Sequence, residues 1–351
     1  VRADFFKKIF LRRKIFLFCH DTLVIDEISM VRADLFDSID KFLRLNGPDA
    51  RQPFGGVRIV VIGDLYQLPP IVRDEERHIF RTLYKSPFFF DAKCYLGGAF
   101  KIIELQQVHR QSDREFVDIL DAIRTCAVTD DQIAKINTRL ETHEEDEKDF
   151  HISLVPTNAM AETINLPQLS RLSGKAQVYE GSIENEFHDR ELPTAHDLAL
   201  KVGAQIMLLN NDPRGKWING DLAQILQLGD ETIRVRFEDG TFDDVGRYRW
   251  ERVRFVYDED EGKIKSEVVG SFTQFPMRLA WAVTIHKGQG KTFDKIVVDF
   301  GTGTFAAGQA YVALSRCRSL EGLVLRSRLE ERHIFLDERV NAFMSGIKRI
   351  D

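Results

Sequence analysis

Continuous apolar runs predict the buried strands of a parallel sheet in the first third of the chain. Residues 23–25 are such a run, residues 57–62 form a second that only Arg58 interrupts, and residues 101–105 predict a third strand although they include Lys101 and Glu104. Runs of this kind are typical of strands that are covered on both faces. Asp26 and Glu27 follow the first run directly. Because open parallel sheets bind ligands beyond the carboxyl ends of their strands, this acidic pair marks a candidate site.

Apolar residues at helical spacing follow these strands. Apolar residues from 35 to 43 predict a helix that Gly47 and Pro48 end. Ser112 and Glu115 predict a capping box for a second amphipathic helix. The first third of the chain therefore alternates strands and helices, as in an α/β protein.

A second α/β unit, interrupted by antiparallel strands, is predicted for the rest of the chain. It begins with a strand at residues 152–155 and a helix at 159–172. Between residues 222 and 272 the pattern changes to strict alternation, in which Ile233 and Val235 alternate with arginines. Period-two alternation between turn signals is typical of short antiparallel strands. We therefore predict a small β-barrel inserted into the second α/β unit.

Composition supports a globular protein with a substantial core. The 351 residues are 43% hydrophobic and 30% charged, and this length allows two or three domains. No apolar run approaches the roughly 20 residues of a membrane span. The net charge is −6, so any nucleic-acid site must be a local groove.

The cysteines and the first residues add little chemistry. Cys19, Cys94, Cys126 and Cys317 are scattered without a CxxC pair, which indicates reduced thiols rather than a zinc site or a disulfide framework.

Residues 1–18 mix phenylalanines with lysines and arginines. A transit peptide is one interpretation, but such segments are rich in serine. We favour the tail of a domain that begins upstream.

The acidic pair can support phosphoryl-transfer chemistry. Asp26 offers the oxygen ligand that Mg²⁺ prefers beside substrate phosphates. Glu27 can orient or deprotonate an attacking water. The alternative is that the pair only ends a strand and caps the next helix.

Five local motifs follow one another along the chain and together carry a resemblance. They are Asp26-Glu27, Gly63-Asp64 with Gln67, Arg110-Gln111, residues 284–290, and residues 311–316. The strings VIDEISMV, GDLYQLPP, HRQ, AVTIHKGQGKTFD and YVALSRCRSLEGL resemble the helicases of the PIF (petite integration frequency) and RecD type. These helicases form the 5′-to-3′ branch of superfamily one. VGAQIMLLNN and INGD extend the resemblance over nearly the whole chain.

The resemblance implies an α/β fold with two RecA-like parallel-sheet lobes. The first lobe would be truncated, and a small SH3-like antiparallel β-barrel would be inserted in the second. The implied domains are residues 1–111 for the partial first lobe with its Walker B motif, residues 112–221 and 273–351 for the second lobe, and residues 222–272 for the barrel.

The resemblance also implies roles in ATP hydrolysis. Asp26 would bind Mg²⁺ and nucleotide, Glu27 would activate water, and Gln67 would sense the γ-phosphate. Arg110 and Arg316 would reach the transferred phosphoryl group from the two lobes as arginine fingers, which are worth about 10³–10⁵ in rate. The alternative for any single arginine is an ordinary surface residue.

The same resemblance implies a DNA track. Thr284, His286 and Lys287 would donate hydrogen bonds to the phosphates of a single strand. Gln289 and Gly290, which follow them, would belong to the nucleotide site. The alternative for His286 is a structural histidine.

Several other residues have two interpretations. Base stacking or core packing explains the aromatic residues Tyr66, Trp217 and Trp250. A DNA surface or an exposed strand face explains the arginines Arg234, Arg236, Arg247, Arg249, Arg252 and Arg254. Arg318 is explained by the surface alone.

Residues 288–292 look like the end of a phosphate-binding loop, GxxxxGK[ST]. The first glycine of that motif would stand at position 285, which is Ile285. We therefore assign this stretch to the DNA track, and Lys291 is not a catalytic lysine. The family carries its Walker A loop, whose backbone N–H groups and lysine hold the β- and γ-phosphates, upstream of the acidic strand. The sequence contains no such motif, so we interpret it as a fragment of a longer helicase.

These expectations define an ATP-dependent DNA helicase that moves 5′-to-3′ along single-stranded DNA, with ATP and Mg²⁺ as cofactors. Its partners would be single-stranded DNA and duplex junctions, without a membrane, and it would act as a monomer in the cytoplasm, nucleoid or nucleus. Without a phosphate-binding loop, the chain alone would be inactive. Two alternatives stay open: a non-hydrolysing nucleic-acid-binding relative that keeps the scaffold, and an RNA-directed helicase.

Overall fold

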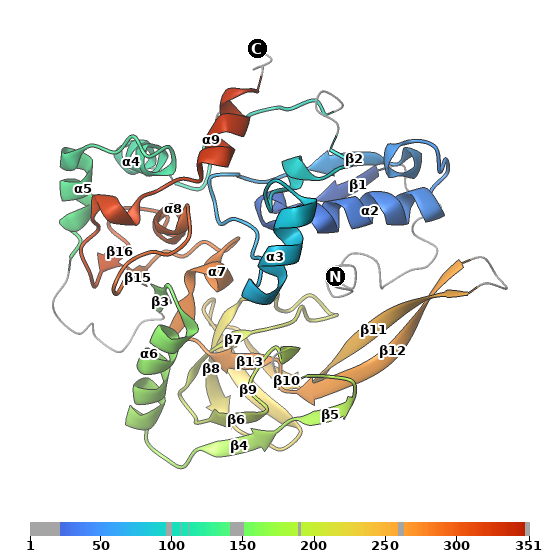
Figure 1. Cartoon of the computed structure of the whole chain (residues 1–351). Helices are drawn as coiled ribbons and strands as arrows, with labels where there is room; N and C mark the ends of the chain where they lie inside the picture. The colour runs from blue at the N-terminus through green and yellow to red at the C-terminus, as the bar shows by residue number, and fades with distance from the viewer. Residues whose placement is uncertain are drawn as a thin grey trace. The chain divides into compact units, whose positions relative to one another are not determined.

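The chain folds into two compact units (Figure 1). The computed structural model describes residues 22–95, 100–105, 107–111, 113–140, 151–188, 191–258 and 263–347. Unit 1 comprises Val1–Lys135, Gly303–Ser315 and Glu330–Asp351, and unit 2 comprises Ile136–Thr302 and Arg316–Leu329. The domain boundaries that the resemblance implies stay a prediction.

Unit 1 contains a two-stranded parallel sheet (Figure 1). β1 (Thr22–Ile25) pairs with β2 (Arg58–Val61), which confirms the first two predicted strands. Their predicted burial on both faces is wrong, because Val24 and Val60 are 52% and 37% exposed. α2 (Ala33–Asn46) packs on this sheet with the apolar face that predicts it. Phe36 and Leu43 on that face are fully buried.

The third predicted strand, at residues 101–105, is wrong. This segment has no regular secondary structure, and Ile103 and Leu105 are 71% and 87% exposed. An apolar run becomes a strand only where its backbone groups find hydrogen-bonding partners. In the described part of unit 1, only β1 and β2 pair with each other as strands.

Helices make up most of the remaining regular structure of unit 1. They are α3 (Asp74–Leu83), α4 (Arg114–Arg124), α5 (Asp130–Asn137, which ends just inside unit 2), α8 (Gln309–Leu314), α9 (Glu338–Ser345), and the short 3₁₀ helices η1 (Ile28–Met30), η2 (Pro53–Gly56), η3 (Phe89–Asp91) and η5 (Glu331–His333). The Asp113 carboxylate caps α4 by accepting a hydrogen bond from the Phe116 N–H (3.3 Å). The cap is therefore one residue later than the predicted Ser112, which lies outside the described residues.

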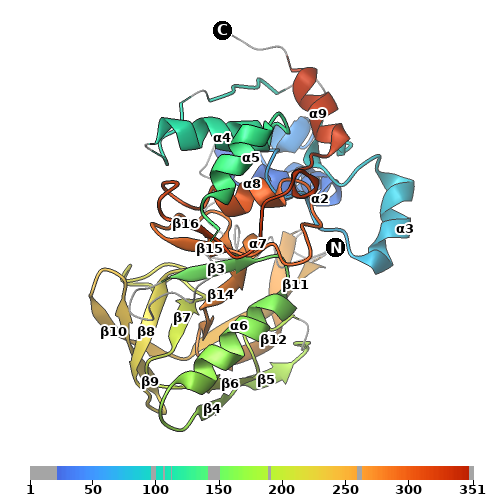
Figure 2. The same cartoon turned by 90° about the vertical axis from the view of Figure 1, so that its left-hand side faces the viewer.

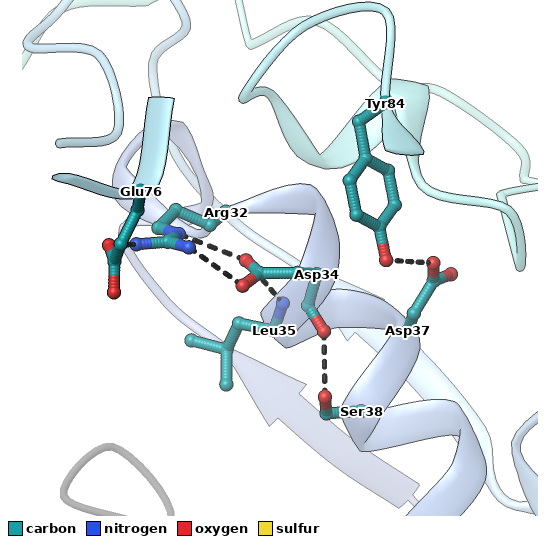
Figure 3. A network of polar contacts seen from close by, with 7 residues as sticks. All are labelled: Arg32, Asp34, Leu35, Asp37, Ser38, Glu76 and Tyr84. Atoms are coloured by element: carbon teal, nitrogen blue, oxygen red, sulfur yellow. Dashed lines mark hydrogen bonds and ion pairs between the residues drawn. The ribbon is translucent and has the colours of Figure 1, made fainter. Parts of the chain in front are cut away.

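A polar network joins α3 to the start of α2 (Figure 3). The Arg32 guanidinium donates two hydrogen bonds to Asp34 (2.9 and 2.8 Å) and one to Glu76 on α3 (2.7 Å). The same guanidinium lies 5.1 Å from the centroid of the Phe80 ring. Phe80 is the buried residue of α3, so this network fixes a helix that is otherwise exposed.

Unit 2 contains a four-stranded parallel sheet in the order β14-β3-β15-β16. Its strands are β14 (Ala282–Thr284), β3 (Ile152–Val155), β15 (Ile296–Val298) and β16 (Leu323–Leu325). Every residue of these strands is buried. α6 (Asn158–Arg171) packs on β3 and β14 (Figure 2). The side chain of Asn165 exchanges two hydrogen bonds of 2.8 Å with the backbone of Ala282, which locks the helix to the sheet.

The antiparallel region of unit 2 is larger than residues 222–272. It comprises sheets in the orders β10-β9-β8-β7-β13 and β11-β12-β5, and the pair β4-β6. The strands are β4 (Gln177–Glu180), β5 (Ser182–Asn185), β6 (Asp197–Leu200), β7 (Gln205–Leu208), β8 (Leu222–Gln227), β9 (Thr232–Phe237), β10 (Phe242–Gly246), β11 (Tyr248–Asp258), β12 (Lys263–Gln274) and β13 (Met277–Leu279). Figure 1 shows the β11–β12 hairpin extending beyond the other strands of this region.

The sequence pattern explains why strands outside residues 222–272 are missing from the prediction. β7 is buried at all four positions and β13 has only three residues, so neither strand shows the period-two alternation that predicts the strands of residues 222–272. β4, β5 and β6 precede that range and are also missing from the prediction. Parallel sheets in both units, with antiparallel strands in the second, confirm the predicted α/β fold class. In the described part of the chain, no helix combines the length and the apolar character needed to cross a membrane.

Candidate functional site

The carboxyl ends of β1 and β2 bring two predicted motifs together. The pairing continues beyond the strands, because the Ile28 N–H donates to the Ile62 carbonyl (3.0 Å). A Cβ atom on Gly63 would lie 2.9 Å from the Ile28 nitrogen, so only glycine allows this approach. Asp26 and Glu27 therefore lie beside the turn that follows β2.

Glu27 has an unusual backbone conformation. Its φ and ψ are 52° and 46°, in the left-handed region, and its N–H donates to Asp26 Oδ1 (2.8 Å). Such a conformation in a residue other than glycine costs on the order of 1–3 kcal/mol and is concentrated at active sites. The strain therefore supports a functional role for Glu27.

The turn after β2 orients Gln67. Asp64 Oδ1 accepts a hydrogen bond from the Tyr66 N–H (3.1 Å). The Asp64 carbonyl accepts from the Gln67 N–H (3.1 Å), and Asp64 Oδ2 accepts from Gln67 Nε2 (3.4 Å). Asp64 thus fixes both the backbone and the side chain of the predicted γ-phosphate sensor.

Gly308, at the start of α8, lies against this turn. A Cβ atom on Gly308 would lie 2.2 Å from the Tyr66 carbonyl oxygen and 2.9 Å from the Gln67 carbonyl oxygen. Its φ is 71°, which also favours glycine. The turn and α8 therefore meet backbone to backbone.

Arg110 and Gln111 attach to the other end of α8. Gln111 is 8% exposed, and its Nε2 donates to the Ser315 carbonyl (3.1 Å). The exposed Arg110 donates to the same carbonyl (3.5 Å). Unit 1 therefore links the acidic pair, the Gln67 turn and the Arg110-Gln111 motif through β2 and α8.

Arg316 belongs to unit 2, where it is 1% exposed. Its guanidinium donates to the Lys291 carbonyl (3.2 Å). Arg318, two residues later, is exposed and forms an ion pair with Asp294 (2.8 Å), which confirms it as a surface residue. The convergence of Arg316 with the nucleotide residues of unit 1 stays a prediction.

Asp26 suits an ion that arrives with a nucleotide. Mg²⁺ is usually held by one or two carboxylates, with waters and substrate phosphates completing its shell. Asp26 offers an exposed carboxylate at a strand end. Among the described residues, no group of three or more His, Cys, Asp and Glu side chains is arranged to hold a metal. A single-carboxylate site for a nucleotide-bound ion fits these donors.

A second polar edge lies at the parallel sheet of unit 2. Thr284 ends β14, and α7 (Ile285–Gly288) follows directly with His286 and Lys287. Because β14 and β3 are parallel neighbours, the residues after β3 reach α7. Lys287 Nζ donates to Asn158 Oδ1 (3.0 Å). Thr284 is only 6% exposed, which makes it the least accessible of the three predicted DNA contacts.

Asn158 contacts a predicted site residue, and the sequence prediction omits it. It begins α6 after Thr157, whose side chain caps the helix by accepting from the Met160 N–H (3.2 Å). The available signal is the polar Thr157-Asn158 pair shortly after β3, one residue farther from its strand than Asp26-Glu27 is from β1.

Burial favours the neutral forms of both basic groups on α7. It lowers the pKa of His286 below its ordinary value, so the imidazole is neutral at pH 7. Burial and the Arg278 guanidinium lower the pKa of Lys287 to about 8, against the opposing effect of Glu162. Lys287 therefore titrates close to physiological pH.

The aromatic candidates pack within their own units. Trp217 is 5% exposed and stacks against Phe237, with ring centroids 6.2 Å apart. Trp250 stacks on the fully buried Phe272 at 5.7 Å. Core packing therefore explains both tryptophans, and base stacking stays a prediction only for Tyr66.

The arginines of the antiparallel region have local partners. Arg249 forms an ion pair with Glu184 (3.0 Å), Arg254 pairs with Glu186 (2.6 Å), and Arg252 donates to the Glu186 carbonyl (3.1 Å). Arg236 donates to the Gln224 side chain and Arg247 to the Glu180 carbonyl. Carboxylates thus pair with Arg249 and Arg254, which favours a solvated strand face for these two residues. For the other arginines, a DNA surface and an exposed strand face both stay open.

Lys291 has a structural partner. Its ammonium group lies 3.4 Å from Asp221 Oδ1, and a Cβ atom on Gly220 would lie 2.3 Å from the Lys291 Cε. The side chain thus ties the Gly220-Asp221 turn to the segment after α7. Gly290 has a φ of 78°, and the nucleotide roles of Gln289 and Gly290 stay predictions.

Comparisons with known proteins agree with these motifs. The model of the PIF1-like helicase family matches residues 13–133. The ATP-dependent DNA helicase Pif1 of Bdellovibrio bacteriovorus is 32% identical over 331 residues, which cover 92% of this chain and 69% of that protein. The ATP-dependent DNA helicase PIF1 of Danio rerio is 34% identical over 323 residues, which cover 86% of this chain and 45% of that protein.

A solved structure shares the fold as well. The crystal structure of Bacteroides Pif1 bound to ssDNA matches with a TM-score of 0.77 and 38% identity, over 93% of this chain and 75% of that one. The chain thus spans less than half of the Danio rerio relative and about two thirds of the Bdellovibrio relative. With the ordered motifs, the sheet edges that carry them and these matches in agreement, this chain belongs to the PIF1-like helicase family.

Proposed function

We propose that this chain carries the motor region of an ATP-dependent DNA helicase that moves 5′-to-3′ along single-stranded DNA. The observation that carries the proposal is the edge of the β1–β2 sheet, where the strained Glu27 lies beside the turn of Gln67. A water-activating carboxylate and a phosphate-sensing amide at one strand edge are the parts that ATP hydrolysis needs.

In this proposal Asp26 would hold Mg²⁺, which would stabilise the negative charge of the nucleotide phosphates. Glu27 orients and deprotonates the attacking water. Gln67 contacts the γ-phosphate, and Arg110 and Arg316 stabilise the charge on the transferred group. Separating DNA costs about 1.4 kcal/mol of stacking per base-pair step, so unwinding must be coupled to this hydrolysis.

The α7 segment supplies the DNA contacts in this proposal. Neutral His286 donates one hydrogen bond to a phosphate, and Lys287 supplies the charge. Relatives have been solved with ADP-AlF3 and ssDNA, and as two coordinating helicases at forked dsDNA. We therefore propose single-stranded and forked DNA as ligands, with one copy of the chain sufficient for binding a single strand.

A non-hydrolysing nucleic-acid-binding relative is the second candidate. It predicts the same DNA binding without any ATP hydrolysis, so hydrolysis assays separate the two candidates.

Changing His286 and Lys287 together to alanine should weaken binding of single-stranded DNA with little dependence on base sequence. Loss of the charged Lys287 should also make the slope of log K against log salt less negative by about 0.7, and the neutral His286 should not change this slope. Fluorescence anisotropy over a salt series measures both effects. The matched control changes the exposed His188 and Lys175 of unit 2 to alanine. Equal binding by both double variants would remove the DNA track from α7.

Binding of single-stranded DNA should weaken as pH rises above 8. The lowered pKa of Lys287, about 8 in the free chain, leaves the amine charged below that pH and neutral above it. DNA phosphate binds the charged form, so above pH 8 each binding event takes up a proton, and affinity falls by up to about tenfold per pH unit. Anisotropy titrations between pH 7 and 9.5 measure this effect.

The matched variant is Lys287→Arg, because a guanidinium stays charged throughout this range. Its affinity should be nearly independent of pH. Parallel pH profiles for the two proteins would show that Lys287 does not contact phosphate.

A further inference from the structure

The turn that carries Gln67 has a partner outside every motif. Arg124 lies in the last turn of α4, 60 residues after Asp64. Its Nε lies 3.4 Å from Asp64 Oδ1. Its guanidinium also covers the Tyr66 ring, 4.4 Å from the ring centroid. One side chain therefore contacts both residues that shape the turn.

Asp64 transmits this contact to Gln67. The same Oδ1 atom that faces Arg124 accepts the Tyr66 N–H (3.1 Å), and the other oxygen accepts the Gln67 amide (3.4 Å). If the Asp64 carboxylate rotates, the hydrogen bonds to Tyr66 and Gln67 change together. The orientation of the carboxylate therefore sets the position of the Gln67 side chain.

The charges of Arg124 and Asp64 favour a persistent contact between their side chains. The side chains of Arg124 and Asp64 are 24% and 20% exposed. Burial lowers the pKa of Arg124, but the nearby Asp64, Tyr311 and Asp121 outweigh burial and raise the pKa overall. The guanidinium therefore keeps its charge. Hydrogen bonds between charged groups are roughly twice as strong as neutral ones, and partial burial protects them from screening.

The turn is also held on its other side. α4 packs against α8, and Gly308 at the start of α8 leaves no room for a Cβ atom beside the Tyr66 carbonyl. The turn thus lies between Arg124 and the backbone of α8. Loss of Arg124 removes the contact on one side of the turn and leaves the half-buried Asp64 without the cation that pairs with it.

We propose that Arg124 is a positioning residue that holds Gln67, through Asp64 and Tyr66, in place for the γ-phosphate. The proposal rests on the ATP hydrolysis proposed above. Arg124 itself need not touch nucleotide or DNA. Small misplacements of a catalytic group cost up to about 10²-fold in rate, so we expect a loss of about tenfold in kcat when Arg124 is changed.

The first test needs no hydrolysis. In Arg124→Met, which keeps the length and apolar stem of the side chain, amide hydrogen exchange at Tyr66 and Gln67 should be about tenfold faster. Exchange in β1, β2 and the middle of α4 should be unchanged. Arg124→Lys should restore part of the protection, because it keeps the charge. Arg114→Met, at the exposed start of the same helix, is the matched control and should leave the turn unchanged.

The second test measures turnover in a protein that hydrolyses ATP, namely this chain preceded by the phosphate-loop segment of a Pif1 relative. Arg124→Met should lower kcat about tenfold, leave the Kd for single-stranded DNA within twofold, and leave the melting temperature close to that of the parent. Arg114→Met should change none of these values.

The two tests separate the proposals. No turnover by the parent protein would overturn the proposed hydrolysis, while the exchange experiment would still decide whether Arg124 holds the turn. Unchanged exchange in Arg124→Met would overturn the positioning role. Equal effects of Arg124→Met and Arg114→Met, or an unaffected kcat in an active protein, would overturn it as well.

Discussion

Glu27→Gln should lower DNA-stimulated ATP hydrolysis by about 10²–10⁴-fold, which is the usual contribution of a general base. Glutamine keeps the size of the side chain and can occupy the left-handed conformation that Glu27 adopts, but it cannot accept the proton of the attacking water. Binding of single-stranded DNA should stay within twofold of the parent, because the DNA contacts proposed here lie on α7. Steady-state hydrolysis and anisotropy measure the two quantities.

The substitution must be tested in a protein that can hold the phosphates of ATP, because the sequence contains no GxxxxGK[ST] motif. We expect hydrolysis in this chain preceded by the phosphate-loop segment of a Pif1 relative, and none in residues 1–351 alone. Positioning of the phosphates supplies much of the catalysis in phosphoryl transfer. Glu75→Gln, on the exposed side of α3, is the matched control.

Two outcomes would contradict this prediction. Equal activities of Glu27→Gln and Glu75→Gln would show that Glu27 is not the base. Hydrolysis by residues 1–351 alone that Glu27→Gln abolishes would show that another segment holds the phosphates, and the assignment of residues 288–292 to the DNA track would then be wrong.

The sequence predicts β1, β2 and the position of the acidic pair, because these signals are local. A short apolar run specifies a strand, and the residue after it falls at a sheet edge wherever the strand pairs. The prediction of a strand at residues 101–105 fails because it also rests on local composition alone. Ile103 and Leu105 have the composition of a strand, but pairing depends on neighbours that local composition does not report.

The finer geometry of the site is not local. The left-handed Glu27 precedes a residue, Ile28, whose backbone closely approaches Gly63, and the contact that holds the Gln67 turn joins Asp64 to Arg124 across 60 residues. No spacing rule connects residues so far apart. Burial also redistributes charge in ways that composition hides, as the pKa of Lys287 at about 8 illustrates.

Arg316→Lys should lower ATP turnover by about 10³-fold or more in the phosphate-loop-extended protein, which is the lower end of the effect of an arginine finger. Lysine keeps a positive charge but lacks the planar fork that contacts two phosphate oxygens. The Kd for single-stranded DNA should change less than twofold. Arg318→Lys is the matched control, because Arg318 is exposed and pairs with Asp294 at the surface; its turnover should stay within twofold of the parent.

The burial of Arg316 makes lysine the informative substitution. The guanidinium donates to the Lys291 carbonyl within unit 2, so alanine would remove a structural hydrogen bond and leave a cavity as well as removing the charge. Lysine can keep most of the packing, and the melting temperature of the Arg316→Lys protein reports whether it does. A large loss of turnover at an unchanged melting temperature would place Arg316 at the phosphoryl group. Equal turnover in Arg316→Lys and Arg318→Lys would instead leave the buried guanidinium with a structural role alone, as the support of the Lys291 backbone.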